Sequence, residues 1–278
     1  MKKVILFFLT LFVASSVWAE LISLSDDPRA SNKLAYKIVS DDEVELYSCW
    51  LSEYSIPSTI TYEGKTYKVI GIGYEAVSSD ITSISIPNSV KYITGAAFAS
   101  CKNLTSIEIP NSVTTIGPRA FENCGFSSIT IPEGVIKISQ GVFTDCSKLT
   151  SVIIPNSVTT IEDEAFSGCS ALKSITIPSS VTNISEEAFA GCTGLVKVSC
   201  LSKTPPEAYA NSFENYNGYL YIPCDNKEDY ELNACFGTFK HIECLGSESV
   251  ELTKDEVKVE PERSEAVFTM PQNESANS

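Results

Sequence analysis

The sequence predicts a mainly β solenoid of the α/β class, a right-handed coil of about 23 residues per turn with capped ends and little helix. The first observation is an Ile-Pro-x-x-Val motif that recurs every 22 or 23 residues. Its isoleucines are Ile86, Ile109, Ile131, Ile154 and Ile177. The second and third are a phenylalanine and a cysteine that keep the same period within each repeat. Three residue types that share one period indicate a stack of repeats rather than a chance pattern.

The repeated phenylalanines and cysteines are expected to form structural ladders. The phenylalanines are Phe98, Phe121, Phe143, Phe166 and Phe189, and the cysteines three residues later are Cys101, Cys124, Cys146, Cys169 and Cys192. One turn cannot bury its own apolar edge, but stacked turns can, with neighbouring strands about 4.8 Å apart. We therefore expect like side chains of successive turns to pile into one dry core.

A single repeat indicates which kind of solenoid this is. Residues 104–109 read Leu-x-x-Ile-x-Ile, the strand pattern of a leucine-rich repeat, with Ile107 and Ile109 pointing inward. Pro110 ends the strand because it has no N–H to donate to a ladder. The fold class is therefore a leucine-rich-repeat solenoid.

The start of the chain resembles a secretory signal peptide. Lys2 and Lys3 precede a short apolar run, and a small-residue cleavage site ends at Ala19. The apolar run is shorter than the roughly 20 residues that a membrane span needs. We expect an exported protein without a transmembrane segment, at the cell surface or extracellular, with the periplasm as an alternative.

The rest of the chain divides by pattern and composition. We expect a signal peptide at 1–19, an N-terminal cap and divergent first repeat at 20–80, and a five-turn array at 81–200. A C-terminal cap at 201–244 follows, and then a partly disordered acidic tail at 245–278.

Composition argues against several functions. The net charge of −15 disfavours a nucleic-acid partner and is expected to keep the protein soluble and monomeric. With His241 as the one histidine and no nucleophile motif or phosphate loop, we expect no catalytic, cofactor or metal site. Acidic clusters at 162–164 and 186–187 fit a solvated turn better than a calcium or acid–base site.

The repeat unit L-x-S-I-x-I-P-x-S-V-x-x-I-x-x-x-A-F-x-x-C resembles the BspA-type leucine-rich repeat, from about Ala35 to Ile242. Residues 202–206 and 220–223 resemble the C-terminal cap of that family. Val77 stands where the first turn would have Phe, and Cys224 where the cap more often has Gly. The resemblance implies adhesion or host-facing recognition and carries no catalytic residues.

Strand residues that point away from the core predict a possible ligand face. They are Thr105, Ser106, Glu108, Ser127, Ser128, Thr130, Thr150, Ser151, Lys173, Ser174 and Thr176. This stripe is rich in hydroxyls and poor in the Trp, Tyr and Arg that binding hot spots favour. It either solvates an open sheet or offers a platform to a protein or glycan.

The cysteines allow two interpretations. The five ladder cysteines are expected to be reduced packing residues, because five equivalent positions cannot all pair. Of the others (Cys49, Cys200, Cys224, Cys235 and Cys244), four crowd the C-terminal cap. Two disulfides there are one possibility, with three connectivities.

These observations together predict an exported, non-enzymatic protein that mediates adhesion or recognition at the cell surface. Its partner would be a protein or glycan, possibly from a host. The alternatives are a structural spacer or assembly subunit, and, less favoured, a carboxylate-dependent glycoside hydrolase.

Overall fold

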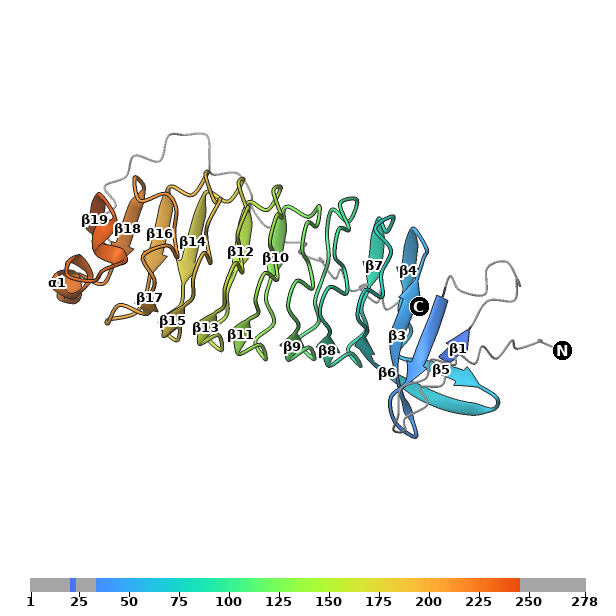
Figure 1. Ribbon diagram of the computed structural model, residues 1–278. Helices are drawn as coiled ribbons and strands as arrows, with labels where there is room; N and C mark the ends of the chain where they lie inside the picture. Colours follow the sequence, from blue (N-terminus) through green and yellow to red (C-terminus); the bar gives the residue numbers. More distant parts are fainter. Residues whose placement is uncertain (1–20, 24–33, 246–278) are drawn as a thin grey trace, which may run out of the picture. The chain divides into compact units, whose positions relative to one another are not determined.

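The computed structural model describes residues 21–23 and 34–245. The signal peptide expected at 1–19 and nearly all of the acidic tail lie outside the described residues. The described part from residue 34 onward is a mainly β solenoid whose turns follow one another along the coil (Figure 1). The predicted fold class is therefore correct.

Two sides of the coil carry short parallel strands. The first side, here called the strand face, holds β4 (Glu53–Ser55), β7 (Ser83–Ser85), β10 (Ser128–Thr130), β12 (Ser151–Ile153), β14 (Ser174–Ile177), β16 (Lys197–Cys200), β18 (Tyr219–Ile222) and β19 (His241–Cys244). The second side holds β6 (Lys65–Ile72), β8 (Tyr92–Ile93), β9 (Thr115–Ile116), β11 (Lys137–Ile138), β13 (Thr160–Ile161), β15 (Asn183–Ile184) and β17 (Glu207–Ala208). Pairing joins positions one repeat apart, such as Ser174 with Lys197. The sequence period therefore sets the register.

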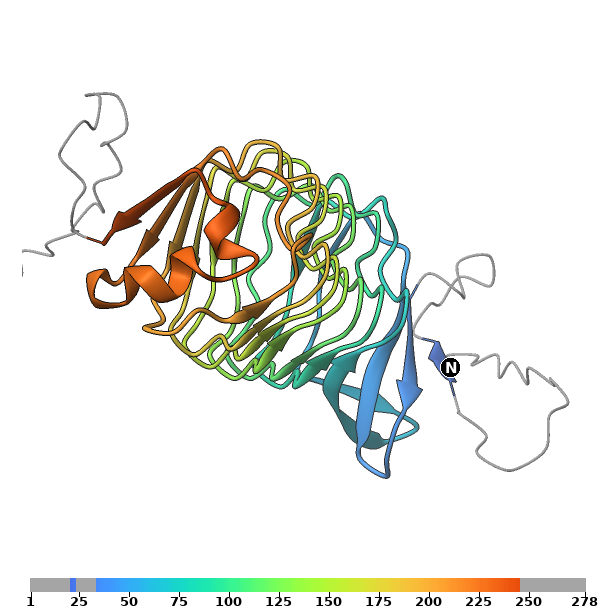
Figure 2. The ribbon, with the colours of Figure 1, turned by 60° about the vertical axis from the view of Figure 1, so that its left-hand side comes forward.

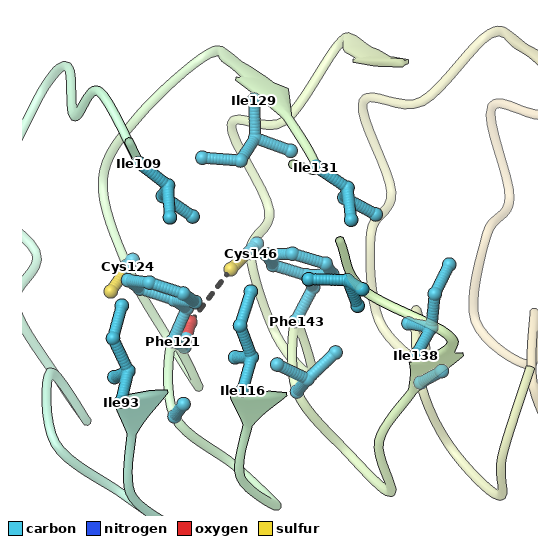
Figure 3. Packing of buried hydrophobic residues seen from close by; sticks show 14 of the residues in the cluster. Ile93, Ile109, Ile116, Phe121, Cys124, Ile129, Ile131, Ile138, Phe143 and Cys146 are labelled. Carbon is cyan, nitrogen blue, oxygen red and sulfur yellow. Dashed lines mark hydrogen bonds between the residues drawn. The ribbon is translucent and has the colours of Figure 1, made fainter. Parts of the chain in front are cut away.

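The third side of the coil is a ladder of turns that contains the repeated phenylalanines. Its backbone bonds also run from each turn to the next, as from the Phe98 N–H to the Ala120 carbonyl at 2.8 Å. The buried rings form a stack that runs along the core, and Figure 3 shows two of its members, Phe121 and Phe143. Centroids lie 5.2 Å apart for Phe98 and Phe121, 5.9 Å for Phe121 and Phe143, and 5.3 Å for each of the next two pairs up to Phe189. A further ring, Phe213, lies 4.8 Å beyond Phe189.

Each ladder cysteine is buried and donates a hydrogen bond from its thiol to the turn before it. Cys124 bonds the carbonyl of Phe98 at 3.1 Å, and Cys146 bonds that of Phe121 at 3.1 Å. Cys169 and Cys192 do the same one and two turns later. A thiol is small enough for this dry position and still donates to a carbonyl, which explains why cysteine suits it.

The repeat with 22 residues interrupts the regular ladders. One residue separates Cys124 from the buried Phe126, whereas two separate Cys101 from Leu104. Phe126 takes the leucine position and meets Phe121 and Phe143 edge-on, at 6.0 and 6.4 Å. The pair that it contacts is the most widely spaced in the phenylalanine stack.

Strand pairing is lost beside this short repeat. Among the described residues, β9 and β11 are not paired with each other, and the segment 104–109 forms no strand. The prediction of a strand at 104–109 is therefore wrong, although Ile109 is buried as predicted. The deletion and the bulkier Phe126 alter the local spacing, and the β pairing depends on that spacing.

The N-terminal cap adds antiparallel strands to the coil. The strands are β1 (Leu21–Ser23), β2 (Leu34–Ile38), β3 (Glu43–Cys49) and β5 (Thr59–Tyr62), with β5 and β6 forming a hairpin. Glu45 is a buried residue, and its carboxylate accepts bonds from the Tyr92 hydroxyl at 3.0 Å and the Lys37 ammonium at 3.2 Å. Val77, in the position of the repeated Phe, is buried and its backbone bridges to Cys49.

The C-terminal cap closes the other end of the coil (Figure 2). It contains η1 (Cys224–Asn226), α1 (Lys227–Glu231) and η2 (Phe236–Thr238). Tyr230 and Phe236 are fully buried, with ring centroids 5.4 Å apart, and Phe236 lies 6.0 Å from Phe213. The cap thus covers the last ring of the stack with aromatic side chains.

Candidate ligand-binding face

The structure places all the residues predicted for the ligand face at exposed positions. They are Thr105, Ser106, Glu108, Ser127, Ser128, Thr130, Thr150, Ser151, Lys173, Ser174 and Thr176. The alternation of the strands explains this, because neighbours such as Ile129 and Ile175 point into the core. These side chains therefore lie on the outside of the strand face.

Strand pairing brings some of these residues together and leaves others apart. Ser128 lies opposite Ser151, and Thr130 lies opposite the exposed Ile153. Ser174 and Thr176 belong to β14 and instead pair with β16, where Ser174 lies opposite Lys197 and Thr176 lies opposite Ser199. Because β12 and β14 are not joined by a ladder among the described residues, the predicted stripe consists of separate blocks.

Glu108 borders an open groove of about 680 Å³ where the ladder is interrupted. The groove is lined by Asn88, residues 107–112 and residues 128–130. Its walls therefore come from turns on both sides of the missing strand pairing. Ser128 and Thr130, which belong to the predicted face, form part of this lining.

The C-terminal end of the strand face carries a group of side chains that sequence reasoning missed. We call Lys197, Tyr219, Tyr221 and His241 the aromatic patch. In the parallel register Lys197 lies opposite Tyr219, and Tyr219 lies opposite His241. The rings of Tyr219 and His241 stack at 4.6 Å, and those of Tyr219 and Tyr221 at 6.1 Å.

The aromatic patch also contains a cation. The Lys197 ammonium lies over the Tyr221 ring, 4.7 Å from its centroid. Tyr219 remains 44% exposed. The signal was present in the sequence, because Tyr-Leu-Tyr-Ile-Pro at 219–223 repeats the alternation that precedes the other prolines. Because residues 220–223 resemble a C-terminal cap, the ligand face predicted from the sequence did not include Tyr221.

The acidic cluster at 162–164 has cationic partners from earlier turns. Glu162 accepts a 2.8 Å bond from Lys137, and Glu164 lies 3.5 Å from Arg119. In the part of the chain that the structure describes, no three His, Cys, Asp or Glu side chains are grouped to hold a metal ion. The cluster at 162–164 thus forms ion pairs between turns, and the solvated turn expected from the sequence stays a prediction.

The ladder thiols are poorly suited to react as nucleophiles. Burial raises the pKa of Cys146 and of Cys192 to about 12, so both remain protonated at neutral pH. The thiolate is the reactive form of cysteine. These positions therefore hold packing and hydrogen-bonding groups.

Of the four cap cysteines, Cys224 is exposed and Cys244 is partly exposed. The cap disulfides considered from the sequence stay a prediction. Cys200 and Cys235 are buried, and each lies beside a tyrosine hydroxyl, of Tyr230 at 3.2 Å and of Tyr216 at 3.7 Å.

Over residues 21–23 and 34–245, no helix is long and apolar enough to cross a bilayer.

Comparisons with known proteins agree with this architecture. The family described as BspA type leucine-rich repeat region matches in six copies over residues 73–242. No curated protein matches the chain at a significant level.

Solved structures with the same kind of coil include a leucine-rich repeat protein from T. pallidum, 28% identical, with a TM-score of 0.55 over 61% of this chain and 84% of that one. A leucine-rich repeat protein from Bacteroides ovatus is 25% identical, with a TM-score of 0.51 over 76% of this chain. This chain spans 66% of the length of the Bacteroides ovatus protein.

A leucine rich cell surface protein from Faecalibacterium prausnitzii is 22% identical, with a TM-score of 0.52 over 76% of this chain and 71% of that one, and shows the fold alone. The family match covers more than half of the chain, and the matched range lies within the stacked turns. The chain therefore belongs to the BspA-type leucine-rich repeat proteins.

Proposed function

We propose that this protein is exported and acts by recognition, binding a protein or glycan ligand at the cell surface through its strand face. The observation that carries the proposal is the aromatic patch in register with the hydroxyl-rich strands. Tyrosines are over-represented among residues that dominate binding energy, because they bury a large area and also offer a hydroxyl. The patch and the stripe of Ser and Thr lie on the same side of the coil.

The core behind the face supports a binding role. Residues on short strands backed by a continuous stack of buried rings are held in place before a ligand arrives. A preorganised surface loses less conformational entropy on binding than a loop would. We infer that the protein acts by binding and not by catalysis, in keeping with its family.

Localisation is part of the proposal. The signal peptide inferred from the sequence and membership of the BspA-type family both support export. Protease treatment of intact cells tests this directly. Degradation of the protein on intact cells is expected, and protection until the cells are lysed would contradict a surface location.

The binding role is tested with the full mature chain on protein and glycan arrays, followed by affinity measurement for each hit. We expect Tyr219→Ala and Lys197→Ala to weaken binding about tenfold or more, as for residues at the centre of an interface. Tyr209→Ala is the matched control, because Tyr209 is 51% exposed and follows β17 on the second side of the coil. Equal loss in the control would place the ligand elsewhere. Hydrolysis of a polysaccharide by the purified chain would favour an enzyme instead.

A further inference from the structure

The four cysteines of the C-terminal cap occupy two different settings. Cys200 and Cys235 are buried and each contacts a tyrosine hydroxyl. Cys224 is exposed and Cys244 is partly exposed. Only the second pair is thus open to a reagent from solvent.

Strand pairing brings Cys224 and Cys244 together. The last strand, β19, runs parallel to β18, with Cys244 opposite Ile222, and the Leu245 N–H donates to the Ile222 carbonyl at 2.7 Å. Cys224 follows Ile222 by two residues, at the start of η1. The Cys244 side chain raises the pKa of the Cys224 thiol, in keeping with the closeness that the strand register gives the two residues.

We propose that Cys224 and Cys244 are a disulfide site that fastens the last strand of the coil to the cap. The oxidant is a disulfide, either a small molecule such as oxidised glutathione or the active-site disulfide of a thiol oxidoreductase. One cysteine thiolate attacks a sulfur atom of that disulfide, forms a mixed disulfide and releases one thiolate. The second cysteine thiolate then displaces the other half. Two protein thiols lose two protons and two electrons, and the oxidant is reduced to two thiols.

The position of this bond gives it a structural consequence. It closes the loop 224–244, which contains η1, α1 and η2. It also restrains β19, an edge strand that pairs only with β18 among the described strands. His241 of β19 belongs to the aromatic patch, so the bond would hold one part of that patch against Tyr219. Cross-links of this kind stabilise mainly by restricting the unfolded chain.

The other cysteines do not compete for the reaction. The ladder thiols are buried and donate to carbonyls, and burial raises the pKa of Cys146 and Cys192 to about 12. The neighbouring Cys244 also raises the pKa of Cys224, so exchange is expected to accelerate at mildly alkaline pH. Because Cys224 and Cys244 are accessible to solvent, they are the pair expected to react with the oxidant.

The test uses the full mature chain, fully reduced and then incubated with a mixture of oxidised and reduced glutathione at mildly alkaline pH. We expect the mass to fall by two hydrogen atoms, the titre of ten thiols to fall by two, and peptide mapping to find one Cys224–Cys244 link. The melting temperature should be higher in the oxidised form than in the reduced form. Ten reactive thiols after denaturation, or a link between other cysteines, would overturn the proposal.

Single variants make the test specific. Cys224→Ser changes an exposed residue, should fold normally and should abolish both the cross-link and the rise in melting temperature. Cys244→Ser should do the same. In Cys200→Ser the link should still form, because Cys200 belongs to the enclosed pair. None of these readouts depends on a ligand, so they stand or fall apart from the proposed binding role.

Discussion

The Cys146 thiol donates a 3.1 Å hydrogen bond to the Phe121 carbonyl of the preceding turn (Figure 3). The carbonyls of Phe98, Phe143 and Phe166 also accept the N–H of the cysteine three residues later in their own turn. Within the described residues the Phe121 carbonyl has no such second donor, and this turn is the one that leads into the one-residue deletion. The thiol hydrogen bond of Cys146 is therefore expected to contribute more to stability than the equivalent bonds of the other ladder cysteines.

Cys146→Ala is expected to destabilise the protein more than Cys169→Ala does. Both variants remove the same atoms, but only the first leaves a buried carbonyl without a partner, which costs about 1–3 kcal/mol. Urea unfolding of the two variants measures the difference. Equal losses of unfolding free energy would show that the thiol bond contributes nothing special at Phe121.

Phe143→Ala is expected to lower the free energy of unfolding by about 3–5 kcal/mol, as for other buried phenylalanines. The ring lies in the stack between Phe121 and Phe166, so its loss leaves a cavity in the middle of the coil. Thermal melts check this against Tyr209→Ala, which alters an exposed ring. A melting temperature of Phe143→Ala equal to that of the control would contradict the stacked core.

Gly125→Ala is expected to destabilise the coil by about 1–3 kcal/mol through overpacking. A Cβ atom at this position would lie 2.0 Å from the Lys102 carbonyl oxygen, which is backbone and cannot move aside easily. Ser128→Ala, at an exposed position of the same turn, serves as the control in chemical denaturation. If both variants unfold at the same denaturant concentration, the short repeat does not require glycine.

Stability is expected to fall as the pH rises from about 9 toward 12. The pKa of Cys192 rises from its ordinary value of 9.0 to about 12 in the folded protein, because burial disfavours the thiolate. In this window the unfolded chain has lost the proton that the folded protein still holds, so rising pH favours unfolding. Cys192→Ala should reduce the slope of unfolding free energy against pH by about 1.4 kcal/mol per unit. An unchanged slope would mean that Cys192 ionises equally in both states.

Sequence reasoning succeeded where one turn predicts the next. The spacing of Ile109, Ile131 and Ile154 predicted the coil, because equivalent positions of a solenoid meet the same surroundings. It failed at residues 104–109, where the motif is intact but the strand is absent. The cause lies in the following repeat, where Phe126 and the one-residue deletion change the spacing.

The sequence by itself determined the repeat, the family resemblance and which side chains point outward, because these depend on local alternation and on a period visible along the chain. The tertiary structure decided which outward residues become neighbours. Lys197, Tyr219 and His241 come from three strands and meet only because parallel pairing places them in one row. The same pairing brings Cys224 to Cys244, since contacts between separate turns depend on register and on the local spacing of the stack.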